Sequence, residues 1–183
     1  TFIENHDTAR FNETYKDFSK YRMGLTMIAT IRGIPQLYYG SEIGMMGDKG
    51  KGDGDIRHDF PGGWNGDANN AFTASGRTPE QSKFFDFTSK LLQWRKTNDV
   101  VHFGKMKHYI PENNVYVYFR YNDKQSVMVV INNSGKPQTF KTARFGESIG
   151  NYKMGKDVLD GKSINLQNEM TIAPKSVLIL ELQ

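Results

Sequence analysis

The period of the hydrophobic pattern changes near residue 101, and this change constrains the fold most. Residues 1–101 combine short apolar runs with stretches of helical spacing, whereas residues 102–183 alternate apolar and polar residues between turn signals. The first pattern is typical of βα units and the second of antiparallel strands. We therefore predict an α/β part over residues 1–101 and an all-β domain over residues 102–183.

Two helices are predicted in the α/β part. Residues 17–32 place apolar side chains at helical spacing, with Asp17 as the N-cap and Gly33 as the C-terminal cap. The second helix begins at residues 78–81, Thr-Pro-Glu-Gln, which have the composition of a capping box with proline at the first helical position. This helix is expected to continue through Asn98.

Short apolar runs at residues 1–3 and 34–40 are predicted to be buried parallel strands, with a long glycine- and aspartate-rich loop over residues 41–77. The resulting order is βαβα. Two such units cannot close an eight-stranded barrel, which needs about 250 residues, so we expect the chain to be the C-terminal part of a larger protein. The strand edges near Thr1 and Leu37 would then lack partners, and we expect them to self-associate or to be poorly ordered.

The all-β domain is predicted to be an antiparallel β-sandwich of seven or eight strands. Residues 115–121 and 126–132 read as a hairpin, residues 132–135 and 160–161 as turns, and residues 176–182 as the last strand. Three side chains on one face of residues 115–121 are interpreted as an amphipathic outer face, with a sugar platform as the alternative: Tyr116, Tyr118 and Arg120. The expected core residues are Phe103, Val117 and Leu178.

Three stretches carry a resemblance to a known family. FIENHD at residues 2–7 resembles the seventh-strand motif of the α-amylase family of glycoside hydrolases (family 13), and GIPQLYYGSE at residues 33–42 resembles its eighth-strand motif. They stand in the family's order, separated by one predicted helix. DGDIRHDFPGGW at residues 53–64 is similar to the eighth loop of neopullulanases and cyclomaltodextrinases of bacterial starch-utilisation systems. The resemblance covers essentially the whole chain.

The resemblance implies the last two βα units of a (β/α)8 TIM barrel followed by the β-sandwich. It also implies a retaining hydrolase of α-1,4-glucosidic bonds in starch-derived oligosaccharides, in which carboxylates stabilise a positively charged sugar ring. Asp7 matches the transition-state stabiliser, and His6 matches a residue that hydrogen-bonds the same sugar. The nucleophilic Asp and acid/base Glu of the family lie on earlier strands. We therefore expect this chain to be inactive alone, with Glu42 a structural residue of the rim.

Three further residues are predicted to bind substrate. Arg10 resembles a family position near the site, although a structural ion pair is the alternative, and Arg57 lies in the family-like loop. Trp64 is expected either to stack on a glucosyl ring or to anchor the loop by packing.

No cofactor is predicted. Asp48, Asp53 and Asp55 suggest calcium in the parent enzyme, but their spacing is not that of an EF-hand and favours a solvated loop. The absence of cysteine excludes a disulfide framework and a thiolate metal site.

The expected ligands are maltooligosaccharides, cyclodextrins or pullulan. A net charge of +4 without a run of like charges argues against nucleic acid, and the apolar stretches are too short for membrane insertion. The resemblance implies a periplasmic location in bacteria, with the cytoplasm as the alternative. An ordinary α-amylase and a carbohydrate-binding module formed by residues 102–183 remain alternative functions.

Overall fold

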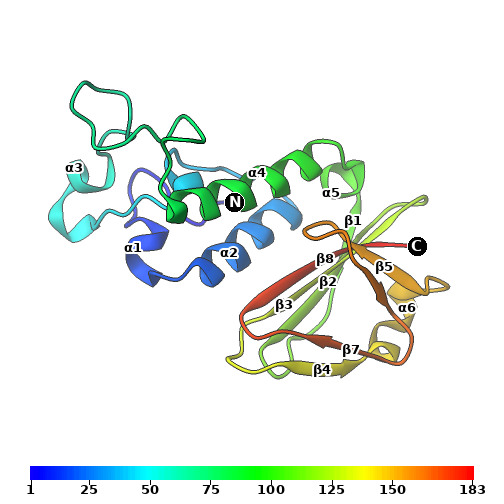
Figure 1. Ribbon diagram of the computed structural model, residues 1–183. Helices are drawn as coiled ribbons and strands as arrows, with labels where there is room; N and C mark the ends of the chain where they lie inside the picture. Colours follow the sequence, from blue (N-terminus) through cyan, green and yellow to red (C-terminus); the bar gives the residue numbers. More distant parts are fainter. The chain divides into compact units, whose positions relative to one another are not determined.

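The computed structural model describes residues 1–183 (Figure 1). The chain divides into two compact units, residues 1–28 with 34–90 and residues 29–33 with 91–183. The α-helices are α1 (Phe11–Tyr15), α2 (Phe18–Thr30), α3 (Asp53–Ile56), α4 (Pro79–Lys96), α5 (Asp99–Phe103) and α6 (Gly146–Ile149). The strands are β1 (Lys105–His108), β2 (Val115–Tyr121), β3 (Ser126–Asn132), β4 (Gln138–Lys141), β5 (Met154–Asp157), β6 (Ser163–Asn165), β7 (Glu169–Ile172) and β8 (Ser176–Leu182). The predicted domain boundary at residues 101/102 stays a prediction.

Helices α2 and α4 begin where the sequence predicts. The Asp17 carboxylate accepts a hydrogen bond from the backbone N–H of Ser19 at 2.8 Å, as an N-cap does. The capping box is confirmed, because Thr78 N donates to Gln81 Oε1 at 2.9 Å and Gln81 N to Thr78 Oγ1 at 3.1 Å. The predicted end of the second helix is two residues late. It ends at Lys96, and Asn98 instead caps α5.

The two helices pack through an aromatic contact in the first unit. The Tyr21 ring lies 4.8 Å from the Phe84 ring, centroid to centroid, and its hydroxyl lies 2.8 Å from Thr88 Oγ1. Burial, with smaller contributions from the Glu42 and Glu4 carboxylates, raises the pKa of Tyr21 far above its ordinary value. Tyr21, Leu25 and Ile28, which lie at helical spacing in the sequence, are all buried, so this spacing predicted the buried face of α2.

The strands predicted at residues 1–3 and 34–40 do not form. These segments run in parallel register through Thr1, whose N–H donates to Ile34 O and whose O accepts from Gln36 N, both at 2.8 Å. Both hydrogen bonds involve the single residue Thr1, and this is too little pairing to form a β-ladder. Ile34 is also 86% exposed, so this segment is not the buried strand that was predicted. The predicted loop also contains α3 and two 3₁₀ turns, Ser41–Ile43 and Lys49–Lys51.

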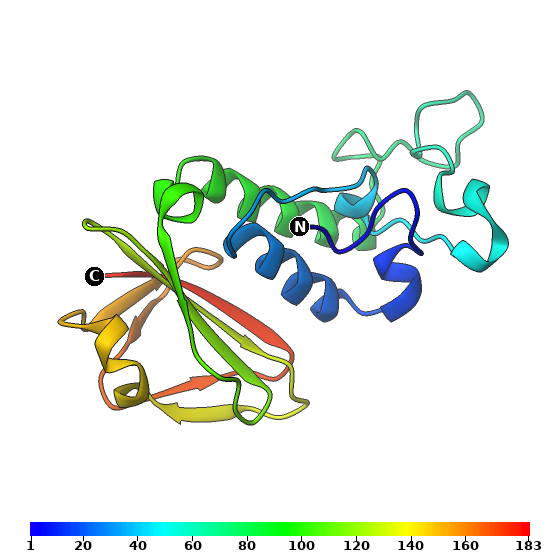
Figure 2. The ribbon, with the colours of Figure 1, turned by 180° about the vertical axis from the view of Figure 1, so that it is seen from behind.

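The second unit contains the predicted β-sandwich (Figure 2). A six-stranded sheet has the order β1-β2-β3-β8-β5-β6, and β4 and β7 form a second sheet. The hairpin of β2 and β3 has the predicted bounds and pairs Val115 with Asn132 at one end and Tyr121 with Ser126 at the other. Alternating residues of both strands face one core, which includes Val117, Phe119, Met128, Val130, Phe145 and Leu180.

The predicted outer face of β2 is wrong, because Tyr118 and Arg120 are buried. Arg120 donates hydrogen bonds to Thr30 O at 2.8 Å, Ile31 O at 3.0 Å and Gly104 O at 2.8 Å. The guanidinium thus satisfies carbonyls at the C-terminus of α2. This contact explains why α2 ends at Thr30 without Gly33 as its cap.

The prediction for Phe103 is also wrong. Val117 is buried and Leu178 packs against the core, as expected, but Phe103 is 86% exposed. Phe103 ends the short helix α5, which buries Val100 and Val101 instead.

None of the helices combines the length and the hydropathy needed to cross a membrane.

Candidate active site

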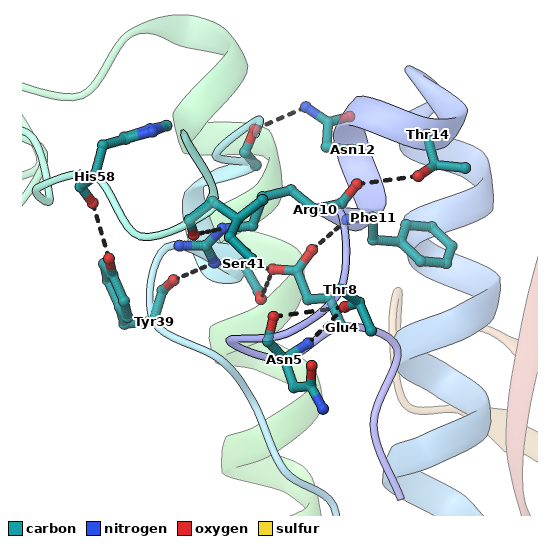
Figure 3. Close-up of polar contacts among 12 residues, drawn as sticks. Glu4, Asn5, Thr8, Arg10, Phe11, Asn12, Thr14, Tyr39, Ser41 and His58 are labelled. Atoms are coloured by element: carbon teal, nitrogen blue, oxygen red, sulfur yellow. Dashed lines mark hydrogen bonds and ion pairs between the residues drawn. The ribbon is translucent and has the colours of Figure 1, made fainter. Parts of the chain in front are cut away.

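A buried ion pair underlies the candidate site (Figure 3). Glu4 and Arg10 are 2% and 0% exposed, and Arg10 Nη1 lies 3.2 Å from Glu4 Oε1. Arg10 also donates from Nη1 to Tyr39 O at 2.7 Å and from Nε to Ile56 O at 3.0 Å. One side chain therefore ties together the first residues of the chain, the segment at Tyr39 and helix α3.

Both oxygens of Glu4 have additional donors. The backbone N–H of Phe11 and the hydroxyl of Ser41 donate to them. The ring of Tyr38 lies with its centroid 4.0 Å from Arg10 Cζ, which is a cation–π distance. A buried charge is stable when it is paired and hydrogen-bonded, and these contacts supply partners for Glu4 and for Nη1 and Nε of Arg10, whereas Arg10 Nη2 is buried without a hydrogen-bond partner.

A tight turn between Glu4 and Arg10 exposes two polar side chains. Asp7 N donates to Asn5 Oδ1 at 2.9 Å, the hydrogen bond of an Asx turn, and Asn5 N donates to Thr8 Oγ1 at 3.0 Å. The side chains of His6 and Asp7 are 59% and 61% exposed, and His6 Nε2 lies 3.1 Å from Asp7 Oδ2. The turn thus presents an imidazole and a carboxylate side by side to solvent.

Arg57, directly after α3, contacts the same carboxylate. Its Nη2 lies 3.0 Å from Asp7 Oδ1 and 2.9 Å from Asp53 Oδ2, and its Nε donates to His6 O at 2.9 Å. A hydrogen bond from Lys49, with a smaller contribution from Arg57, lowers the pKa of Asp53. The two oxygens of Asp7 therefore face a cation and an imidazole.

The remaining candidates lie elsewhere. Arg10 is beneath the turn rather than at the surface, so the ion pair considered as its alternative is present. Trp64 is 67% exposed, and its backbone N–H donates to Asp67 Oδ2 at 3.1 Å. No polar or ring contact joins Trp64 to His6, Asp7 or Arg57. The structure thus brings three of the predicted residues together directly.

Two carboxylates of this unit were not predicted to take part in the site. Glu4 is the buried partner of Arg10. The two residues are six positions apart, a spacing that neither a helix nor a strand would predict to be in contact. Glu42 lies near the same pair; burial raises its pKa, and its Oε2 has no hydrogen-bond partner. The sequence offered no local signal for either environment.

The aspartates that suggested calcium do not converge. Asp48 Oδ1 accepts from Gly50 N at 2.8 Å, Asp55 Oδ2 accepts from Asp48 N at 2.6 Å, and Asp53 pairs with Lys49 and Arg57. No group of three or more His, Cys, Asp or Glu side chains in the structure has the arrangement of a metal site.

Comparison with known families decides the affiliation of the chain. Residues 1–133 match the family described as "Alpha amylase, catalytic domain". The chain belongs to the α-amylase family. Its residues 106–181 also match a second family, described as "Cyclo-malto-dextrinase C-terminal domain".

Curated relatives are much longer than this chain. It is 31% identical over 169 residues to a cyclomaltodextrin glucanotransferase of Geobacillus stearothermophilus, a match covering 91% of this chain and 21% of the relative. It is 26% identical over 171 residues to an α-amylase of Niallia circulans, with 89% and 29% covered. The chain therefore spans about a fifth to a third of the relatives it matches.

Solved structures share the fold. The α-amylase of Geobacillus thermoleovorans, crystallised with acarbose, matches with a TM-score of 0.78 and 21% identity over 100% of this chain and 38% of that one. CldA, a cyclomaltodextrin glucanotransferase with a three-domain ABC distribution, matches with a TM-score of 0.73 and 24% identity over 99% and 36%. The fold is thus the end of an α-amylase catalytic barrel followed by an antiparallel β-sandwich.

Proposed function

We propose that this chain is the C-terminal part of a retaining glycoside hydrolase that cleaves α-1,4-glucosidic bonds in starch-derived oligosaccharides. The observation that carries the proposal is the exposed Asp7 carboxylate, flanked by His6 and Arg57 above the buried Glu4–Arg10 pair. Membership of the α-amylase family supports it. So do the names of the relatives, among which are amylases and glucanotransferases.

Asp7 acts as the transition-state stabiliser in this proposal. Cleavage of a glycosidic bond develops positive charge on the sugar ring, and a fixed carboxylate beside that ring lowers the energy of the transition state. Arg57 holds one oxygen of Asp7, and His6 donates a hydrogen bond to the same sugar. Arg10 is a positioning residue, because it binds the carbonyl of Ile56 immediately before Arg57. Trp64 stacks on a neighbouring glucosyl ring.

The nucleophile and the general acid come from a preceding part of the full-length protein in this proposal. A retaining hydrolase needs two carboxyl groups about 5 to 5.5 Å apart, one as nucleophile and one as acid and base. The 183-residue chain should therefore not hydrolyse maltooligosaccharides or cyclodextrins. Turnover by the chain above that of its Asp7→Ala variant would contradict this part of the proposal.

The retaining mechanism has its own test in the full-length protein. The first product formed from a maltooligosaccharide should be the α-anomer, observed by proton NMR before mutarotation. An initial β-anomer would contradict retention of configuration.

Two substrate assignments within the family are distinguished by their products. The match of residues 106–181 to a cyclomaltodextrinase domain supports a neopullulanase or cyclomaltodextrinase, which consumes cyclodextrins. The cyclomaltodextrin glucanotransferases among the relatives favour a second candidate, a transglycosylase that forms cyclodextrins from starch. We prefer the first. Net formation of cyclodextrins when the full-length protein is incubated with starch would contradict our choice.

A further inference from the structure

A hollow of about 250 Å³ opens into one end of the sandwich core. It lies in the second unit, between β1, the tip of the β2–β3 hairpin and α6, and includes no residue of the Asp7 site. Its volume suits a single hexose ring. The residues that matter for the argument are Phe119, Tyr121, Gln125, Ser126 and Tyr152.

The pairing of the hairpin explains why these side chains meet. Tyr121 and Ser126 are cross-strand partners at the end of the hairpin. Because side chains alternate along a strand, they share the face on which Phe119 and Met128 enter the core. Tyr152 packs against that core as well. The hollow therefore has aromatic walls continuous with the hydrophobic interior.

One buried polar side chain in the hollow lacks a hydrogen-bond partner, and an exposed amide lies beside it. Ser126 is only 7% exposed, and its Oγ is buried without a partner. Gln125, next to it, is exposed, and its backbone N–H donates to Asn122 Oδ1 at 2.9 Å. Its side-chain amide therefore lies where a ligand in the hollow could reach it. Buried polar groups in folded proteins are nearly always paired, so an unpaired Ser126 hydroxyl indicates a missing partner.

The rim of the hollow is charged but has no net charge. Lys107 Nζ lies 2.6 Å from Glu147 Oε2, and Tyr109 donates its hydroxyl proton to Glu147 Oε1 at 3.1 Å. An ionic ligand would have to compete with this pair. A neutral ligand with several hydroxyl groups can instead hydrogen-bond both partners.

We propose that this hollow binds one hexosyl unit of a neutral glucan. A sugar ring combines an apolar face, which suits Tyr121 and Tyr152, with hydroxyl groups, which suit Ser126 and Gln125. Tyr152 also lines a second, more open hollow of about 620 Å³, which has room for adjoining units of the same chain. The choice of an α-glucan rests on the proposed function, whereas the hollow and its unpaired Ser126 hydroxyl do not.

Isothermal titration calorimetry of the 183-residue chain with maltotriose tests the proposal. Ser126→Ala and Gln125→Ala should each weaken binding about fivefold, because each removes one hydrogen bond to the sugar. Ser163→Ala, at an exposed serine of β6, is the matched control and should bind as the wild type does. Ser126→Ala should not lower the thermal midpoint without sugar, because the serine hydroxyl has no partner to lose.

Three results would overturn the proposal. One is the absence of maltotriose binding by the wild-type chain, and another is unchanged affinity in both Ser126→Ala and Gln125→Ala. Tighter binding of cellotriose than of maltotriose would overturn the choice of an α-glucan. None of these results depends on catalysis by Asp7, so a failure here differs from a failure of the proposed function.

Discussion

Glu4 Oε1 and Arg10 Nη1 lie 3.2 Å apart in the interior, and the exposed His6–Asp7 pair lies between these two residues in the sequence. The buried pair thus fixes both ends of the turn that presents the carboxylate. This arrangement separates the residues that hold the site from the residues that meet solvent.

Removing the charge of Glu4 should strongly destabilise the chain. Glu4→Gln removes the ion-pair partner of the buried Arg10 guanidinium, which costs about 3–5 kcal/mol in comparable buried pairs. Urea unfolding measures the loss. Glu13→Gln is the control, because Glu13 pairs with the exposed Lys16 at 3.3 Å and such surface pairs contribute about 1 kcal/mol or less. Equal losses in the two variants would contradict the role of the buried pair.

Gly47→Ala should disturb the packing of α3 against Arg10. A Cβ at Gly47 would lie 2.5 Å from Asp55 O, 3.0 Å from Arg10 Cγ and 3.0 Å from Ile56 Cα. The backbone must shift, at a cost of about 1–3 kcal/mol in the free energy of unfolding. Gly54→Ala is the matched control, since its Cβ would meet no atom within 4 Å. A stability for Gly47→Ala as high as that of Gly54→Ala would show that the contact is unimportant.

Arg120→Lys should destabilise the second unit by about 3 kcal/mol, because an ammonium cannot reach the separate carbonyls that the guanidinium fork binds. Circular dichroism during urea unfolding reports the change. Arg144→Lys serves as the control, because Arg144 is more exposed and pairs with Glu112 at 2.8 Å. The account of Arg120 fails if its variant loses no more stability than the control.

Glu42 should make the free energy of unfolding fall with rising pH. Burial raises its pKa above the ordinary value of 4.5, so between these two values the folded state binds more protons than the unfolded state. The stability advantage of Glu42→Gln over the wild type should therefore grow from pH 4.5 up to the raised pKa and then level off. Urea unfolding across this range measures it. A constant difference would contradict the assignment.

Sequence reasoning succeeded where the determining contacts are local. The β2–β3 hairpin has the predicted bounds because alternation and the turn between Tyr121 and Ser126 fix its register. The capping box at Thr78 depends on residues three positions apart.

It failed where the contact comes from a distant residue. The partner of the α2 carboxyl end is Arg120, about 90 positions away, and the segments at Thr1 and Ile34 pair too briefly to form strands. At the candidate site, the pattern predicted His6 and Asp7, which the structure places side by side, whereas the buried partners of Arg10 come from distant segments and could not be read from the sequence.

The kcat/KM of Asp7→Asn in the full-length protein, measured on a maltooligosaccharide, tests the central claim most directly. The amide keeps the shape of Asp7 but removes the charge that faces the sugar cation, so we predict a loss of about 100-fold or more. Asp53→Asn is the matched control, because Asp53 binds the same Nη2 of Arg57 at 2.9 Å and should retain activity within a few-fold. A kcat/KM of Asp7→Asn equal to that of Asp53→Asn would contradict the account.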